Sequence, residues 1–271
     1  MKLKLENTGP VNRADIDINR INVVGGVNTS GKSIISKLLY CCLKSRIDDE
    51  SIDFLMDSEG LKSFKDSDIV FDGDVIPSDV FYIDNISILD LKDLEILRLD
   101  HIVHMKEALE RDDNAPSSKT SQILSKIQNI INSDCLNLTG ISSGIKEIGV
   151  IQALLKNSSL KENSFLIIDE PESNLHPEWQ IRFAHVLVLL AKELNITLYL
   201  NSHSPMFIEA VSLYSQYYDL TDKTSFYLTE KYDDGYIFKK INPKNMGAVY
   251  ENLTRPYDEL DKLKAKIIFK E

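Results

Sequence analysis

A glycine-rich stretch near the N-terminus, Gly26–Ser33, has the spacing G-x-x-x-x-G-K-[ST] of the phosphate-binding loop of nucleoside triphosphatases. Glycines at these positions allow backbone N–H groups to surround phosphate oxygens, and the following helix N-terminus adds partial positive charge. We expect Lys32 to reach the β- and γ-phosphates and Ser33 to hold Mg²⁺. The candidate nucleotide-binding residues of this loop are Gly26, Asn28, Thr29, Ser30, Gly31, Lys32 and Ser33. The loop therefore predicts a site for a nucleotide with Mg²⁺.

A pair of carboxylates follows an apolar run in the second half of the chain. The run 165–168 is typical of a buried strand, and Asp169 and Glu170 come directly after it, as in a Walker B element. Hydrolysis of a nucleotide needs one carboxylate near Mg²⁺, normally through water, and a second that orients the attacking water. We assign the first role to Asp169 and the second, catalytic role to Glu170.

His203 follows the next predicted strand, 196–200. A helix of about 17 residues, roughly 26 Å long, separates that strand from Glu170, so the two strand ends should lie side by side. From there, His203 can donate a hydrogen bond to the γ-phosphate and is the second catalytic candidate. By contrast, His101 and His104 have the spacing of one helix face, and we expect a surface helix rather than a metal site.

A serine- and glycine-rich stretch, 141–146, precedes a predicted helix upstream of the Walker B element. Hydroxyl groups, a glycine backbone and a helix N-terminus together form an anion-binding cap. Ser142, Ser143 and Gly144 are therefore further candidate nucleotide-binding residues. By itself this pattern is common at helix starts, and its position before Asp169 makes it informative.

The order of the predicted elements indicates an α/β fold. We expect strands at about 2–6, 14–18, 21–24, 80–83, 165–168, 196–200, 225–229 and 236–241, and helices at about 33–43, 88–103, 121–131, 145–157, 177–194 and 256–266. The short apolar clusters at 52–55 and 61–64 suggest short helices as well. The strand–helix–strand run around Glu170 is a parallel crossover, which favours a doubly wound sheet. We predict a P-loop mixed sheet with N-terminal antiparallel strands. Residues 1–44 and 136–271 would form a discontinuous ATPase core, and 45–135 a partly helical lid insertion.

Composition and charge limit the classes of function for this 271-residue chain. Its formal net charge is −11, whereas proteins that bind nucleic acid by themselves usually carry a basic excess. The charge does not indicate a nucleic acid partner, although local basic patches would allow one. Cys41, Cys42 and Cys135 are too few and badly spaced for a disulfide framework or a zinc site. No apolar run could span a membrane and no signal segment is evident, so we expect a cytoplasmic protein without a membrane partner.

Taken together, these motifs resemble the ATPase heads of ABC-type proteins, in particular the SMC-like and overcoming-lysogenisation-defect (OLD) branch. The resemblance covers nearly the whole chain and is most specific in Glu170–Pro177 and Asn201–Pro205. It implies that 141–146 is the signature motif, which contacts the γ-phosphate held by another subunit, so that two heads enclose two ATP molecules. Glu172–Leu175 would be the D-loop at that interface.

The chain also departs from these families. Ser143 and Ile145 replace the glycine and glutamine of transporter signatures, and 82–85 lies where a Q-loop would be, without its glutamine. OLD nucleases continue into a Toprim domain, for which the sequence after Thr229 has neither the room nor the acidic pattern. We therefore expect no nuclease in this chain.

By this resemblance, the protein is expected to be a stand-alone ATPase of the bacterial "AAA family ATPase" group. It would form an ATP-dependent homodimer or higher homo-oligomer and control a separate effector protein, a nuclease or toxin, in anti-phage or toxin–antitoxin-like defence. The main alternative is an SMC-like ATPase that engages DNA in repair or recombination. A nucleotide-binding scaffold without turnover and a transporter head are weaker alternatives, because Asp169 and Glu170 are both present and a Q-loop glutamine is not evident.

Overall fold

The computed structural model describes residues 1–61, 68–84, 99–111, 116–131, 143–243, 246–254 and 256–269. Its strands are β1 (Lys2–Thr8), β2 (Val11–Asp17), β3 (Ile21–Gly25), β4 (Asp68–Asp72), β5 (Val80–Ile83), β6 (Phe165–Asp169), β7 (Thr197–Ser202), β8 (Thr224–Tyr232) and β9 (Gly235–Ile241). Its α-helices are α1 (Lys32–Asp48), α2 (Ile52–Ser58), α3 (Asp100–Glu110), α4 (Ser118–Ile131), α5 (Ser143–Lys156), α6 (Pro177–Glu193), α7 (Pro205–Tyr217), α8 (Gly247–Thr254) and α9 (Pro256–Phe269).

Within the described residues, the strands form one mixed sheet in the order β4-β1-β2-β9-β8-β3-β7-β6-β5. The run from β8 through β3, β7 and β6 to β5 is parallel, and β1 pairs with β2 and β4 in antiparallel fashion. The carboxyl-terminal ends of β3, β6 and β7 therefore lie side by side at one edge of the sheet. In α/β sheets, ligands bind at this carboxyl edge.

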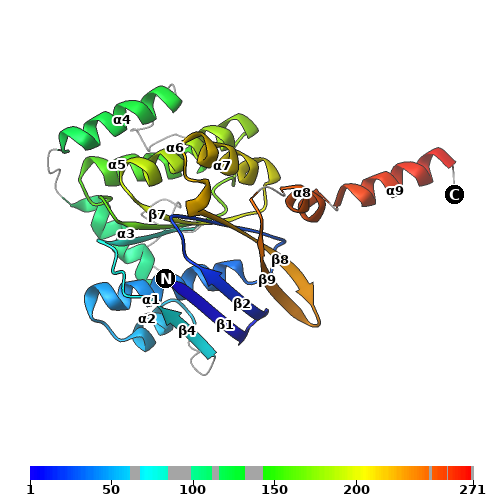
Figure 1. Cartoon of the computed structure of the whole chain (residues 1–271), viewed down its shortest axis with the longest axis horizontal. Coiled ribbons are helices and arrows are strands. Elements are labelled where there is room, and N and C mark those ends of the chain that lie inside the picture. Colours follow the sequence, from blue (N-terminus) through cyan, green and yellow to red (C-terminus); the bar gives the residue numbers. More distant parts are fainter. Residues whose placement is uncertain are drawn as a thin grey trace.

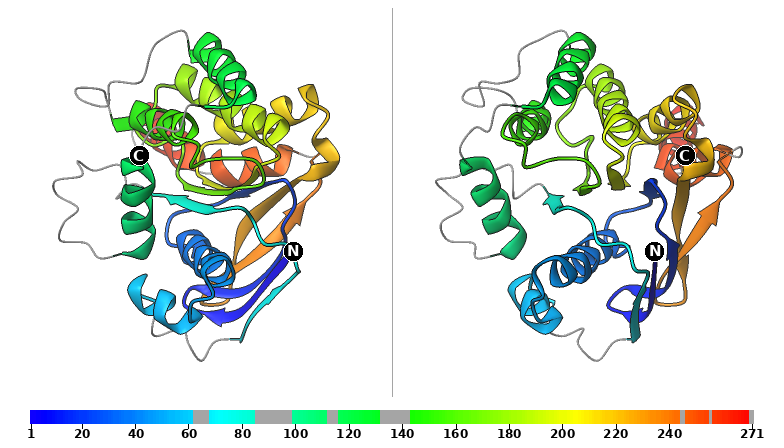
Figure 2. Two further views of the ribbon diagram at one scale, coloured as in Figure 1. Left: turned by 90° about the vertical axis from the view of Figure 1, so that its left-hand side faces the viewer. Right: turned by 60° about the vertical axis from the view of Figure 1, so that its left-hand side comes forward.

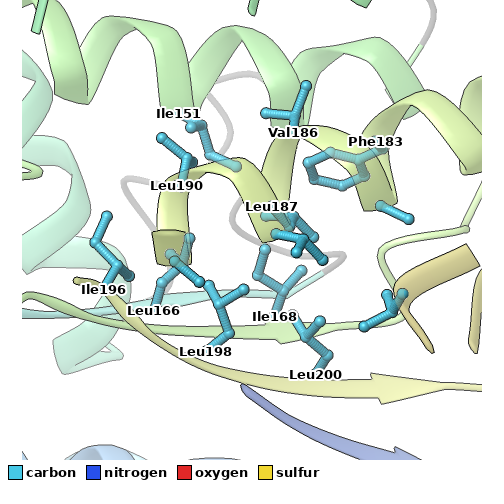
Figure 3. Close-up of a cluster of buried hydrophobic side chains, with 14 of the residues drawn as sticks. Ile151, Leu166, Ile168, Phe183, Val186, Leu187, Leu190, Ile196, Leu198 and Leu200 are labelled. Atoms are coloured by element: carbon cyan, nitrogen blue, oxygen red, sulfur yellow. The ribbon is translucent and has the colours of Figure 1, made fainter. Parts of the chain in front are cut away.

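Helices cover both faces of the parallel strands. Helices α4, α5, α6 and α7 lie on one face, and α1 and α2 lie on the other (Figures 1 and 2). Alternate residues of each buried strand serve the two layers: Leu166 and Ile168 of β6 pack in the cluster under α6, whereas Phe165 and Ile167 pack with α1. Figure 3 shows the first cluster, in which Leu187 and Leu190 of α6 lie over β6 and β7. These layers hold the strand ends rigidly.

Local signals explain where the helices near the carboxyl edge begin. Gly31, with φ of 90°, precedes α1, and Pro177 and Pro205 occupy the first turns of α6 and α7. Ser204 accepts a hydrogen bond from the backbone N–H of Phe207 and so caps α7. Three helices therefore start where the parallel strands end.

The predicted α/β P-loop fold with N-terminal antiparallel strands is confirmed. Three elements were not predicted: the edge strand β4, the helix α7 and the short helix α8. The predicted helix 88–103 is wrong in its bounds, because Leu99 is extended and α3 runs from Asp100 to Glu110. The part of that prediction at 88–98 lies outside the described residues.

The division into a core and a lid at 45–135 stays a prediction. Strands β4 and β5 both fall within 45–135, and each is an edge strand of the main sheet, on β1 and β6 respectively. This segment therefore contributes to the sheet as well as supplying helices. At the other end of the chain, α9 extends away from the body (Figure 1).

Candidate functional site

The predicted phosphate-binding loop connects β3 to α1 at the carboxyl edge of the sheet. Gly31 has φ of 90°, and Thr29 also has a positive φ, of 66°. A Cβ on Gly31 would lie 2.4 Å from a methyl group of Val11, and one on Gly26 would lie 1.9 Å from the hydroxyl of Thr229. Close packing therefore requires glycine at both positions, and the positive φ favours glycine at position 31 as well.

Lys32 lies across this loop. Its Nζ donates to the carbonyl oxygens of Gly26, at 3.0 Å, and Val27, at 2.8 Å. Burial lowers the pKa of Lys32 to about 8, while the neighbouring carboxylates of Asp169 and Glu170 act in the opposite direction. The arrangement holds the ammonium group at the centre of the loop.

Asp169, at the end of β6, is buried and surrounded by hydrogen-bond donors. Its Oδ1 accepts from Ser36 Oγ at 2.7 Å and Asn201 Nδ2 at 2.5 Å, and its Oδ2 accepts from Tyr82 OH at 2.9 Å. Burial raises the pKa of Asp169, and hydrogen bonds from Ser36, Ser33 and Tyr82 among others oppose this shift. The donors come from α1, β5 and β7, so three elements fix the orientation of one carboxylate.

Glu170 and His203 meet at the adjacent ends of β6 and β7. His203 Nε2 lies 3.1 Å from Glu170 Oε1, and Ser173 donates to Glu170 Oε2 at 3.1 Å. The backbone of Glu170 is left-handed, with φ of 55°, and its N–H donates to Asn201. Such a conformation is unfavourable for a residue with a side chain and is found preferentially at functional sites. Burial and nearby Lys32 lower the pKa of His203.

Glu172, in the predicted D-loop, supports the histidine from within the same chain. Its Oε1 accepts from the backbone N–H of His203 at 2.5 Å and of Ser204 at 3.0 Å. Burial raises the pKa of Glu172, and these backbone hydrogen bonds act against that shift. Glu172 therefore fixes the turn that carries His203, a role the sequence did not indicate.

A cavity of about 420 Å³ brings the two predicted motifs together. Its lining includes Asn28, Thr29, Ser30, Gly31, Lys32, Ser33, Asp169, Glu170, Asn201 and His203, with Pro10 and Ile34. The oxygen atoms of this cavity suit a hydrated Mg²⁺, because the Ser33 hydroxyl and the Asp169 carboxylate line it together. In addition, the buried Asn201 Oδ1 has no hydrogen-bond partner among the described residues. Within the described part of the chain, no cluster of three or more His, Cys, Asp or Glu forms a separate metal site.

The predicted signature residues are not part of this cavity's described lining. Ser142 lies outside the described residues, and Ser143 and Gly144 begin α5, where their side chains are not described. Their role, like the roles assigned to the loop, Asp169, Glu170 and His203, stays a prediction.

The expectation that His101 and His104 lie on a surface helix is wrong. Both side chains are buried against the sheet: His101 Nδ1 lies 2.7 Å from Glu59 Oε2, and His104 Nε2 lies 3.0 Å from Asp79 Oδ1. Their carboxylate partners are distant in the sequence, so no local pattern indicates them.

Ser36, Tyr82 and Asn201 are further residues of the site that sequence reasoning did not assign. Ser36 lies one helical turn after Ser33, which could have placed it near the metal ligand. Tyr82 lies in a strand predicted as buried, where a tyrosine hydroxyl usually needs a partner.

The fold and site define a class of protein. The structure is similar to cbiO1 from Clostridium perfringens, part of the ABC transporter complex cbiONQ, with a TM-score of 0.52, 18% identity and coverage of 96% of this chain and 98% of that one. It is also similar to the SMC head domain from Thermotoga maritima, with a TM-score of 0.50, 14% identity and coverage of 89% and 98%. The chain therefore has the P-loop NTPase fold shared by ABC-type and SMC heads.

A family model gives a second finding. The model described as "AAA domain, putative AbiEii toxin, Type IV TA system" matches residues 101–209, which include the Walker B pair and His203. Comparison with curated proteins found no match. Among the described helices, none is long and apolar enough to cross a membrane.

Proposed function

We propose that this protein is an ATPase that hydrolyses ATP to ADP and phosphate. The observation that supports this most is the convergence of Lys32, Asp169, Glu170 and His203 on one cavity, from parts of the sequence more than 130 residues apart. A phosphate loop alone would fit many nucleotide-binding proteins. The adjacent carboxylate and histidine supply what water attack on a phosphate needs.

Each residue has a distinct role in this reaction. The N–H groups of the loop and the Lys32 ammonium bind the β- and γ-phosphates, and His203 donates to the γ-phosphate. Glu170 orients a water molecule and accepts its proton, the water oxygen bonds to the γ-phosphorus, and the bond to the β–γ bridging oxygen breaks. Ser33 and, through water, Asp169 would hold Mg²⁺, which neutralises charge on the phosphates when bound.

The experiment that tests this proposal removes one role at a time. Glu170→Gln should retain ATP binding but lose hydrolysis by at least about 100-fold, because the amide cannot take a proton from water. Lys32→Ala should lose ATP binding as well. Fluorescent-nucleotide titration and phosphate release measure the two properties. Glu178→Gln, at an exposed glutamate paired with Arg182 on α6, is the control and should match wild type.

This experiment also decides between the ATPase and a nucleotide-binding scaffold. Wild-type protein that binds ATP but hydrolyses it no faster than Glu170→Gln would contradict the proposal. Hydrolysis that survives in Lys32→Ala would contradict the assignment of the site.

We further propose that the protein is OLD-like and acts from the cytoplasm as an ATP-dependent homodimer. It would control a separate nuclease or toxin in bacterial defence. The description of the matching family, which names a toxin and a type IV toxin–antitoxin system, supports this setting. Affinity purification of Glu170→Gln with ATP from the native host should capture one effector protein, which Lys32→Ala does not capture. Recovery of chromosomal DNA instead would favour the SMC-like alternative, which the net charge of −11 disfavours.

A further inference from the structure

Tyr82 connects Asp169, the Walker B carboxylate, to the part of the chain that contains α2 and α3. That part lies in the sequence between the phosphate-binding loop and Asp169. Tyr82 lies on the edge strand β5, its side chain is buried, and its hydroxyl donates to Asp169 Oδ2 at 2.9 Å. Asp169 Oδ1 is already bonded to Ser36 and Asn201. The tyrosine therefore holds the second carboxylate oxygen, and with it the rotation of the carboxylate plane.

The position of Tyr82 is in turn set by His101 of α3. The two rings have centroids 4.6 Å apart, and the His101 side chain is fully buried. Its Nδ1 lies 2.7 Å from Glu59 Oε2, and its Nε2 lies 3.4 Å from Asp84 Oδ2. Because Glu59 follows α2 and Asp84 follows β5, the imidazole is held between carboxylates from two other elements.

A continuous set of buried contacts thus runs from α2 and α3 to Asp169. A hydrogen bond from outside the ligand shell orients a metal ligand, and its loss typically costs about 10- to 100-fold in metal affinity or activity. Neither Tyr82 nor His101 lines the cavity, so neither touches nucleotide or water there directly. The hydrogen bond from Tyr82 to Asp169 Oδ2 is their connection to a carboxylate of the cavity lining.

We propose that Tyr82 is the positioning residue of the metal-binding carboxylate Asp169, and that His101 holds Tyr82 in place, so that packing of α2 and α3 governs how the site uses Mg²⁺. This inference rests on the proposed function, and it assigns a regulation to the same site. The segment that contains α2 and α3 thereby acts on the nucleotide site through two side chains.

The first test compares two tyrosine-to-phenylalanine changes in the Glu170→Gln background, where no turnover occurs. Tyr82→Phe keeps the ring and removes the hydroxyl that bonds Asp169. It should raise the Mg²⁺ concentration for half-maximal binding of fluorescent ATP by about tenfold, and leave binding in EDTA unchanged. Tyr227→Phe is the matched control, because Tyr227 on β8 is as buried as Tyr82 and its hydroxyl accepts a hydrogen bond from the backbone N–H of Asp17 at 2.9 Å, away from Asp169. It should leave the Mg²⁺ dependence unchanged.

The second test applies the same measurement to the histidines of α3. His101→Gln should raise the half-maximal Mg²⁺ concentration in the same direction as Tyr82→Phe, and the double variant should show no larger shift than Tyr82→Phe alone, since both act through one contact. His104→Gln is the control, because His104 is stacked on Phe81 and bonds Asp79.

The outcomes separate this inference from the proposed function. Equal Mg²⁺ dependence in Tyr82→Phe and Tyr227→Phe, with nucleotide binding intact, would overturn the positioning role and leave the ATPase proposal standing. Shifts that add in the double variant would overturn the coupling through His101. Absence of Mg²⁺-dependent nucleotide binding in the Glu170→Gln parent would overturn both proposals.

Discussion

At the residue scale, the pair of His203 and Glu170 is the central contact of the site. The imidazole Nε2 and the carboxylate Oε1 are 3.1 Å apart, on neighbouring strand ends. Burial and the nearby Lys32 ammonium lower the pKa of His203, so the neutral imidazole is favoured. A neutral imidazole carries one N–H donor and one acceptor nitrogen, which suits a group that orients other atoms rather than a charge that binds phosphate.

We predict that His203→Ala lowers the rate of ATP hydrolysis by about 100-fold, while the affinity for ATP changes by less than about threefold. The physical reason is that Lys32 and the loop bind the phosphates, whereas His203 orients the γ-phosphate and Glu170. Phosphate release and fluorescent-nucleotide titration measure the two effects.

The control for this prediction is His185→Ala. His185 lies on α6, half-buried against Tyr218 and away from the cavity. A His203→Ala variant that hydrolyses ATP at the rate of His185→Ala would show that the histidine has no part in the reaction.

At the scale of elements, buried pairs between His101 and two carboxylates hold α3 to the end of α2 and to the residue after β5. Burial by itself lowers the pKa of His101, but the carboxylates of Asp84 and Glu59 outweigh this effect and raise the pKa to about 9. Lys37 also lies 3.8 Å from Glu59, and the rings of Tyr40 and Tyr82 flank the imidazole. His101 is therefore a buried imidazolium at neutral pH.

We predict a loss of stability at alkaline pH from this group. A raised pKa in the folded state contributes stability that is complete below the unfolded pKa of about 6.5 and is lost as pH rises through about 9. The full contribution is roughly 3 kcal/mol. Urea unfolding at pH 6 and at pH 9.5 should show this loss in wild type.

His101→Gln is the variant that isolates the effect, because glutamine does not titrate. Its unfolding free energy should be lower than that of wild type at pH 6 and should change less between the two pH values. Parallel pH profiles for the two proteins would contradict the assignment to His101.

For the whole molecule, the proposed arrangement places each nucleotide between two copies of the chain. The loop with Lys32 belongs to one copy, and the signature residue Ser142 would come from the other. A closed two-fold dimer has one interface in which each contact between the copies occurs twice, so one dimer would hold two sites.

We predict complementation between two inactive variants. Lys32→Ala and Ser142→Glu should each be inactive alone. Their equimolar mixture should recover up to about a quarter of wild-type hydrolysis, because half of the randomly formed dimers hold one intact composite site out of two. Phosphate release by the mixture, with each variant alone as the control, measures this. If the mixture stays inactive while wild-type protein dimerises with ATP, the site is contained in one chain.

The sequence by itself predicted the P-loop fold and placed the two motifs at the ends of buried strands. Gly26–Ser33 and Asp169–Glu170 were predicted because their chemistry demands residue types at fixed short spacings, which a linear pattern records. The P-loop fold was predicted for a related reason, since buried strands and amphipathic helices have a period in the sequence.

Only the tertiary structure decided which distant residues support these motifs. Tyr82 is 87 positions from Asp169, and His101 is 42 positions from Glu59, so neither contact leaves a local pattern. Strand β4 was missed for the same physical reason, because an edge strand is defined by its pairing with β1 rather than by its own apolar period. Contacts between distant segments depend on how the layers pack, and packing is settled by the fold as a whole.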